Sequence, residues 1–275
     1  MSEILQDLSA PALVTAIEEN WFEHFRLFRY WSHAEVHDGP GVLWTISDIP
    51  FIHFNGVLRA QLAPENVEAT IEAATTRCRS RNMPLLWLTG PATRPANLGA
   101  YLEAHGVNHA WDSIGMAADL LTLNEDLPAP PSLTIEQVSD VETLRQWSHV
   151  VCGVFEWPEF VEDAWVDFFV SVGLEARLPL RCYLGWLDGE PVATSYVILA
   201  AGVAGIYGVS TAPEARRQGI GTAIVLAPLR EARALGYRVG ILHASEMGFS
   251  VYHRIGFREY CGIGNYIMEK QYGAE

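Results

Sequence analysis

The sequence has little positive charge and almost no lysine. Its 275 residues contain 18 Lys and Arg against 33 Asp and Glu, which gives a formal net charge of −15. Lys270 is the single lysine. Binding to nucleic acid or to an anionic membrane requires cations that face phosphates. We therefore expect neither nucleic acid nor a membrane as a partner.

Cysteine and long hydrophobic runs are also scarce. The four cysteines form no C-x-x-C pair, the spacing typical of zinc and redox sites, so we expect no metal and reduced, buried thiols in a cytoplasmic protein. The uncharged stretch 193–209 has 17 residues and three glycines, which favours two adjacent strands over a membrane helix. The N-terminus lacks the basic start of a signal peptide.

A proline-rich stretch divides the chain. Three prolines occur within Leu127-Pro-Ala-Pro-Pro-Ser132, which neither a helix nor an interior strand tolerates. We expect one domain over 1–127, an extended linker over 128–132 and a second domain over 133–275. Each half is long enough to form its own core.

Periodicity predicts a mixed α/β (α+β) architecture in both halves. In the first half we expect helices at 10–30, 65–81 and 97–105, and strands at 41–47, 51–59, 84–89 and 109–121. In the second half we expect strands at 133–138, 181–187, 190–200, 202–210, 239–244 and 257–269, and helices at 140–154, 160–174, 219–235 and 247–254. Pro228 falls inside the helix 219–235, where an interior proline costs about 3 kcal/mol. We therefore expect either a kink or a shorter helix there.

The most informative segment joins the strand ending near Ser210 to the helix that opens at Gly219-Ile-Gly221. Glycines let a ligand approach the backbone, and unpaired N–H groups at a helix start attract anions. Arg216 and Arg217 add positive charge. The segment indicates a phosphate site, or else an ordinary glycine-rich helix start with two solvated arginines. The dinucleotide and nucleoside-triphosphate fingerprints both fail here, because Ile224 replaces the third glycine and no Gly-Lys-Ser/Thr follows.

At these residues the chain resembles the GNAT superfamily of N-acetyltransferases. The family motif Arg/Gln-x-x-Gly-x-Gly/Ala stands here as Arg216-Arg-Gln-Gly219-Ile-Gly221. The family's closing Tyr-x-x-x-Gly-Phe stands at Tyr252–Phe257, and the likeness covers roughly 132–270. The resemblance implies acetyl-CoA as co-substrate, with the pantetheine arm on the backbone of a strand that splays from its parallel neighbour. The residues it implies for binding are Val209, Ser210, Thr211, Arg216, Arg217, Gln218, Gly219, Ile220, Gly221, Thr222 and Ser245.

The resemblance also implies a mechanism. An acceptor amine attacks the thioester directly, and Tyr252 protonates the departing thiolate, which suits a phenol with a pKa of about 10. The general base stays open. The strand 203–209 has no carboxylate, which leaves His243, Glu246, or a water chain ending at backbone or at Tyr207.

The first half resembles a degenerate GNAT-like domain, since its element order echoes the second half but no R-x-x-G-x-G precedes Glu65. We expect two GNAT-like domains, the C-terminal one complete, in a monomer or homodimer that acetylates an amine of a small molecule or peptide. Aromatic residues and carboxylates in the helices 140–154 and 160–174 lie where the family shapes its acceptor pocket. Two alternatives remain: a non-catalytic module that binds CoA or acyl-CoA, and a transferase of longer acyl groups.

Overall fold

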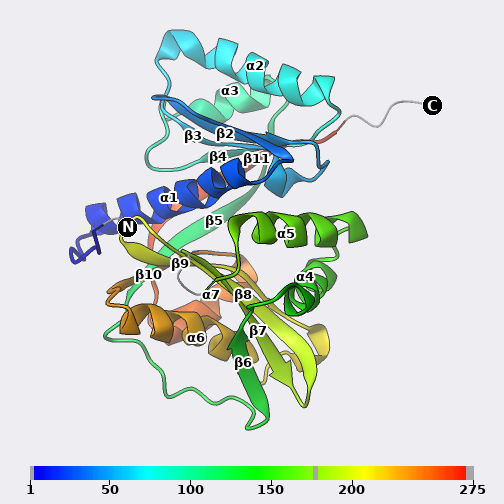
Figure 1. Cartoon of the computed structure of the whole chain (residues 1–275). Coiled ribbons are helices and arrows are strands. Elements are labelled where there is room, and N and C mark those ends of the chain that lie inside the picture. The colour runs from blue at the N-terminus through cyan, green and yellow to red at the C-terminus, as the bar shows by residue number, and fades with distance from the viewer. Residues whose placement is uncertain (1–2, 176–178, 271–275) are drawn as a thin grey trace. The chain divides into compact units, whose positions relative to one another are not determined.

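The computed structural model describes residues 3–175 and 179–270, which divide into two compact units (Figure 1). The larger unit contains the residues up to Asn20 together with Gly115–Tyr260. The smaller unit contains Trp21–Ile114 together with the segment from Cys261 onward. Helix α1 (Ala10–Arg26) and strands β5 (Asn108–Asp119) and β11 (Arg258–Met268) each contribute residues to both units.

The larger unit is a mixed sheet flanked by helices, in the strand order β5-β10-β9-β8-β7-β6 (Figure 1). Neighbours from β6 to β9 are antiparallel, and β9 and β10 are parallel. The strands are β6 (Leu133–Gln137), β7 (Leu180–Leu187), β8 (Glu190–Ala200), β9 (Val203–Thr211) and β10 (Val239–Ala244). The helices are α4 (Val141–Phe155), α5 (Glu159–Val172), α6 (Ile220–Ala234) and α7 (Glu246–Ile255), with a 3-10 turn η4 at Pro213–Ala215. The order predicted from the sequence is confirmed throughout this unit.

In the smaller unit the strands of the same 11-stranded sheet follow in the order β1-β2-β3-β4-β11-β5. Its strands are β1 (Ala34–Asp38), β2 (Val42–Ser47), β3 (Gly56–Ala60) and β4 (Leu85–Thr89). Its helices are α2 (Val67–Ser80) and α3 (Leu98–Ala104), with 3-10 turns η1 (Leu27–Tyr30), η2 (Ile52–Phe54) and η3 (Pro64–Asn66). The short edge strand β1, mostly polar and exposed, was not predicted.

The predicted strand 51–59 is wrong in its first half, which forms the turn η2 before β3. Buried Asn55 explains the difference. Its side-chain amide donates to the carbonyls of Ile49 (2.8 Å) and Phe51 (2.9 Å), and its Oδ1 accepts from the Ser47 N–H (2.8 Å). These bonds replace a strand ladder and close the connection into a compact loop.

The two units do not follow the linear division at the prolines. β11 pairs antiparallel with β4, and its residues Gly264–Met268 lie opposite Thr89–Leu85. Most of the C-terminal strand is therefore part of the smaller unit, and residues 3–20 are part of the larger one. Pairing between strands so distant in sequence leaves no local signal. The domain boundaries expected at 127 and 133 therefore do not include it.

The residues just before the proline-rich linker are tied to α6 and α7. Glu125 accepts from Arg230 Nε (2.7 Å) and from Arg233, and these hydrogen bonds hold the pKa of its carboxyl below the ordinary value. The N–H of Asn124 donates to the carbonyl of Ile255 (2.9 Å). These contacts fix residues 124–125 along the larger unit.

All four cysteines are free, and three of them are buried. Burial raises the pKa of Cys78 to about 11 and that of Cys152 to about 12, so both stay thiols at neutral pH. The uncharged run 193–209 forms parts of β8 and β9, as predicted. Among the described residues, no helix combines the length and the hydropathy required to cross a membrane.

Helix α6 continues through Pro228 instead of ending before it. Pro228 has no N–H, so the carbonyl of Ile224, four residues earlier, loses its helical donor. The hydroxyl of Ser195 on β8 donates to that carbonyl (2.8 Å), and Ser195 is fully buried. A neighbouring strand therefore supplies the hydrogen bond that the proline removes.

We expect Ser195→Ala to destabilise the larger unit by about 1–3 kcal/mol, because it leaves a buried carbonyl unsatisfied. In a Pro228→Ala background the helix regains its own donor, and the same substitution should cost well under half as much. Urea unfolding of the four proteins in this double-mutant cycle measures both values. Equal costs in the two backgrounds would show that Ser195 does not compensate for the proline.

Candidate functional site

Strands β9 and β10 run parallel but stay paired over a short stretch only. The ladder joins Ala204–Ile206 to Gly240–Leu242, whereas β9 continues to Thr211 and β10 to Ala244. Beyond Ile206 the facing edges of these two strands have no ladder between them. Backbone N–H and C=O groups at an unpaired edge can bind an extended ligand as an added strand would.

A β-bulge in β9 lies where the two strands part. Tyr196 of β8 pairs with Tyr207 and Thr194 pairs with Ser210, so Gly208 and Val209 together oppose one residue of β8. Gly208 has φ +57°, a conformation that favours glycine. The Thr194 hydroxyl donates to the Gly208 carbonyl (2.8 Å) and fixes the bulge. A bulge bends its strand, which accounts for the separation from β10.

The glycines of β9 do not leave open space. A Cβ at Gly205 would lie 2.0 Å from Asn20 Oδ1, and one at Gly208 would lie 2.7 Å from the Tyr196 ring. Both positions are occupied by neighbouring side chains. Gly205 and Gly208 therefore provide no room for a longer acyl group.

The turn between η4 and α6 presents free backbone donors. Arg217 (φ 62°) and Gly219 (φ +87°) both adopt left-handed conformations. Within the described part of the chain, the N–H groups of residues 217–220 have no hydrogen-bond acceptor. Successive free N–H groups at a helix start form an anion-binding concavity with the helix dipole behind it. The N–H of Thr222, expected among these donors, already donates to the Gly219 carbonyl (3.1 Å).

Arginine and close packing hold this turn in place. Arg216 Nε donates to the carbonyl of Thr211 at the end of β9 (3.0 Å). The Pro128 carbonyl lies against Gly219, where a Cβ would sit 1.9 Å from that oxygen. Gly221 is different, since a Cβ there would meet only the Thr211 hydroxyl at 3.5 Å. The two glycines of the motif therefore have different structural roles.

Tyr252 lies on α7, which begins directly after β10. Its side chain is buried and packs back over Gly248, whose Cβ position is 2.7 Å from the Tyr252 ring and 3.2 Å from its hydroxyl. The phenol is thus directed along the helix toward the end of β10. Burial raises the pKa of Tyr252 to about 12, so the hydroxyl keeps its proton at neutral pH. Ser245 caps α7 by accepting from the Gly248 N–H (3.3 Å).

The candidate bases differ in their surroundings. Burial lowers the pKa of His243 to about 4, so its imidazole is neutral at pH 7 but only weakly basic. The Tyr207 hydroxyl donates to Asn20 Oδ1 (2.7 Å), and burial holds its pKa far above the ordinary value. Glu246 is exposed in the first turn of α7. Burial therefore makes His243 and Tyr207 poor bases at neutral pH.

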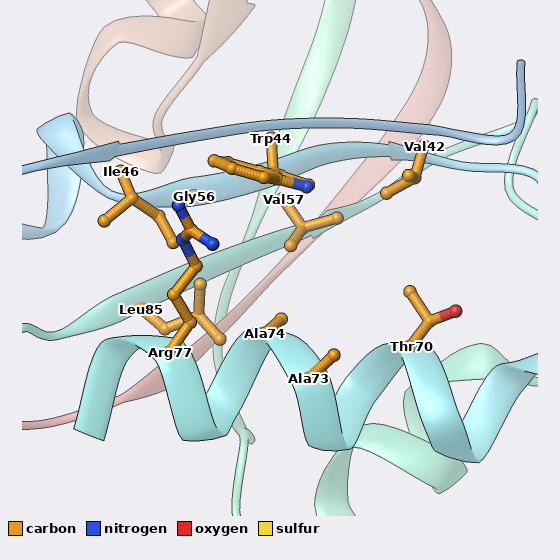
Figure 2. A pocket seen from close by; sticks show the side chains of 10 residues that line it. All are labelled: Val42, Trp44, Ile46, Gly56, Val57, Thr70, Ala73, Ala74, Arg77 and Leu85. Carbon is orange, nitrogen blue, oxygen red and sulfur yellow. The ribbon is translucent and has the colours of Figure 1, made fainter. Parts of the chain in front are cut away.

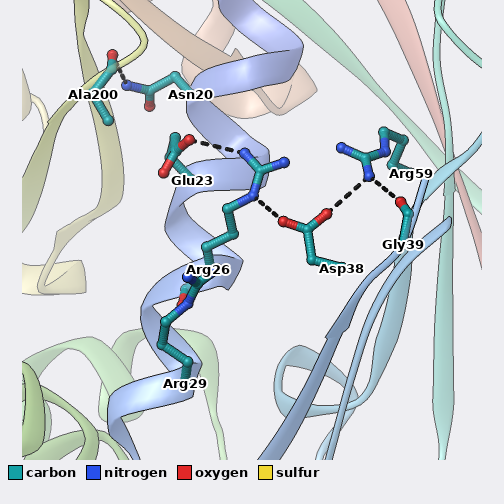
Figure 3. A network of polar contacts seen from close by, with 8 residues as sticks. All are labelled: Asn20, Glu23, Arg26, Arg29, Asp38, Gly39, Arg59 and Ala200. Carbon is teal, nitrogen blue, oxygen red and sulfur yellow. Dashed lines mark hydrogen bonds and ion pairs between the residues drawn. The ribbon is translucent and has the colours of Figure 1, made fainter. Parts of the chain in front are cut away.

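Asn20 is the residue that the sequence reasoning missed. Its amide donates to the carbonyls of Ile198 (3.0 Å) and Ala200 (2.9 Å), the second of which appears in Figure 3. It thereby joins α1 to β8 and, through Tyr207, to β9. A signal was present, because Asn20 lies at helical spacing after Leu13 and Ile17 on the apolar face of α1.

The aromatic residues of α4 and α5 separate into two groups. Trp165, Phe168 and Phe169 belong to the buried core, as the helical spacing favoured. Phe155 and Phe160 are 45% and 43% exposed, and the Phe155 ring stacks on Trp157 with centroids 4.9 Å apart. Two of the nearby carboxylates have partners, Glu162 with His149 and Asp163 with Arg145.

Comparison with known proteins agrees with this architecture. Residues 144–260 match the family model described as Acetyltransferase (GNAT) domain. No curated protein matches the chain.

Solved structures share the fold over most of the chain. A GCN5-related N-acetyltransferase from Kribbella flavida is 18% identical, with a TM-score of 0.69 over 91% of this chain and 94% of its own. A GCN5-related N-acetyltransferase from Sphaerobacter thermophilus is 14% identical, with a TM-score of 0.64 over 97% and 93%. A tandem GNAT protein from the clavulanic acid biosynthesis pathway is 15% identical, with a TM-score of 0.60 over 95% and 97%.

We expect Gly219→Ala to destabilise the larger unit by about 1–3 kcal/mol, because alanine opposes the left-handed backbone and meets the Pro128 carbonyl. Gly221→Ala serves as the matched control and should be neutral or stabilise by up to about 1 kcal/mol, since its helical backbone accepts a Cβ. Urea unfolding measures both. Equal effects would contradict the different roles assigned to these glycines.

Proposed function

We propose that this chain is an acetyl-CoA-dependent N-acetyltransferase acting on a primary amine of a small molecule or peptide, because residues 144–260 match the family model of a GNAT acetyltransferase domain. The observation that supports this best is the juxtaposition of the unpaired β9 edge with the anion-binding turn. One end of the site suits an extended amide-containing chain, and the other suits a pyrophosphate.

The binding of acetyl-CoA is assigned to this chain's own backbone. The free N–H groups of residues 217–220 hold the pyrophosphate, together with the neighbouring Gly221 and Thr222 and the charges of Arg216 and Arg217. The backbone of Val209–Thr211 pairs with the pantetheine arm. Ser245 and Gln218 remain in this proposed set, Ser245 with its hydroxyl already engaged as the cap of α7.

The reaction is a direct transfer. The amine nitrogen bonds to the thioester carbonyl carbon, and a tetrahedral intermediate collapses as the C–S bond breaks. An N–H of β9 stabilises the oxyanion. Tyr252, which keeps its proton up to about pH 12, donates to the departing thiolate. Since His243 and Tyr207 are poor bases here and Glu246 lies exposed in the first turn of α7, the ammonium proton passes to water.

The smaller unit is proposed to be a degenerate GNAT-like domain. Its strands and helices follow the order strand-strand-strand-helix-strand-helix-strand, which echoes the larger unit. Between β3 and α2 the sequence has Gln61-Leu-Ala-Pro64 in place of a phosphate turn. The chain is then a tandem protein of the cytoplasm, monomeric or homodimeric, with one acetyl-CoA site.

A non-catalytic module that binds CoA or acyl-CoA is the second candidate. The observation that favours it is the absence of a carboxylate on β9, where many members of the resembling superfamily carry a glutamate. Both candidates require the same cofactor site, and turnover separates them.

Acetyl-CoA or CoA at 100 times its Kd should stabilise the protein by about 2.7 kcal/mol in thermal unfolding, and ATP should stabilise it less. Gly221→Glu should abolish the shift, because the added carboxylate repels the pyrophosphate while the backbone tolerates a side chain there. Gly153→Glu places the same charge in open space on α4 and should leave the shift intact. No shift in the wild type, or an equal shift in Gly221→Glu, would refute the assigned cofactor site.

Tyr252→Phe should lower kcat by about 100-fold or more and leave the Kd of acetyl-CoA unchanged, because it removes the proton donor and keeps the packing. Tyr260→Phe, outside the site, is the matched control and should retain full activity. A CoA-release assay with an amine panel supplies kcat, and calorimetry supplies Kd. If Tyr252→Phe keeps its kcat, the tyrosine is a packing residue; if the wild type binds acetyl-CoA without turnover, the non-catalytic module is favoured.

A further inference from the structure

The smaller unit contains a cavity between α2 and strands β2–β4 (Figure 2). Its volume is about 180 Å³. The sheet side is apolar and is formed by Val42, Trp44, Ile46, Val57 and Leu85. An apolar cavity of about 150 Å³ accommodates benzene, so this space fits a single ring with one small substituent.

Small residues on α2 create the cavity. Ala73 and Ala74 face the sheet where a larger side chain would fill the space (Figure 2). The surrounding core of the smaller unit is otherwise filled by buried residues such as Ile71 and Trp87. The cavity is therefore a local feature of α2 within a well-packed unit.

Positive charge stands beside this apolar space. Arg77 lines the cavity, and its guanidinium carbon is 4.8 Å from the centroid of the Trp44 ring. Arg77 and Arg81 both donate to one carboxylate, that of Glu35, and the hydrogen bond from Arg81 is the largest cause that lowers the Glu35 pKa. Two guanidinium groups thus share one carboxylate, which leaves one net positive charge.

Arg77 also retains an unused donor. Its Nε is buried and has no acceptor in the part of the chain that the structure describes. A buried N–H without an acceptor is costly, and a carboxylate oxygen would satisfy it.

We propose that this cavity binds a small apolar carboxylic acid, one ring or a branched chain of about six to eight carbon atoms. The apolar body lies against Trp44 and the aliphatic wall, and the carboxylate accepts from Arg77. The site lies in the unit that lacks a phosphate turn, and it is independent of the proposed acetyl transfer.

The test uses benzoate as the probe and benzyl alcohol as a neutral molecule of similar size. Ligand-observed NMR and calorimetry on the full chain should show benzoate binding. Ala74→Leu should abolish it by filling the cavity, whereas Ala69→Leu, the same change at an exposed position of α2, should leave it unchanged. Absence of benzoate binding, or binding that survives Ala74→Leu, overturns the site.

Arg77→Gln tests the ligand class. It should weaken benzoate at least about tenfold, the usual effect of losing a hydrogen bond to a charged group, and change benzyl alcohol by less than about twofold. Equal effects on the two probes, or no effect on benzoate, overturn the assignment of an anionic ligand. Because binding is read directly, the result does not depend on acetyl-CoA or on turnover.

Discussion

The separation of β9 from β10 is the constraint on which the larger unit depends. Parallel strands normally stay paired along their length, and here the pairing stops at Ile206 because a bulge at Gly208 bends β9. The free edge, the turn that follows Thr211 and the start of α7 all lie at the same end of these two strands. The proposed acetyl-CoA site follows from one local irregularity in one strand.

Close packing by distant segments maintains that irregularity. Asn20 from α1 occupies the space at Gly205 and accepts from Tyr207, and the Pro128 carbonyl occupies the space at Gly219. In each case glycine lets a neighbouring group contact the backbone, and that group occupies the space that a side chain would need. Helix α6 also depends on a distant segment. Pro228 removes one of its backbone donors, and the Ser195 hydroxyl of β8 supplies the missing hydrogen bond. The larger unit is held together by such non-local polar contacts as well as by its apolar core.

Much of the fold could be predicted because its signals are local. The helices around Leu144 and Leu229 show apolar spacing, and the hairpin at Asp188-Gly189 joins two strands as expected. The candidate site could also be predicted from the sequence, since Arg216–Gly221 and Tyr252–Phe257 lie on the elements that their spacing indicated. The predictions failed where a buried side chain directs the backbone, as Asn55 does before β3, and where a strand is short and polar, as β1 is.

The sequence by itself determined the order of strands and helices in the larger unit, the glycine turn at the start of α6 and the position of Tyr252 on α7. These features depend on residues within a few positions of one another, so periodicity and motif spacing reveal them. Only the tertiary structure decided that β11 joins β4, that Asn20 fills the space at Gly205 and that Ala73 and Ala74 leave a cavity beside Arg77. These depend on contacts between residues far apart in the chain, whose geometry exists only after the chain has folded.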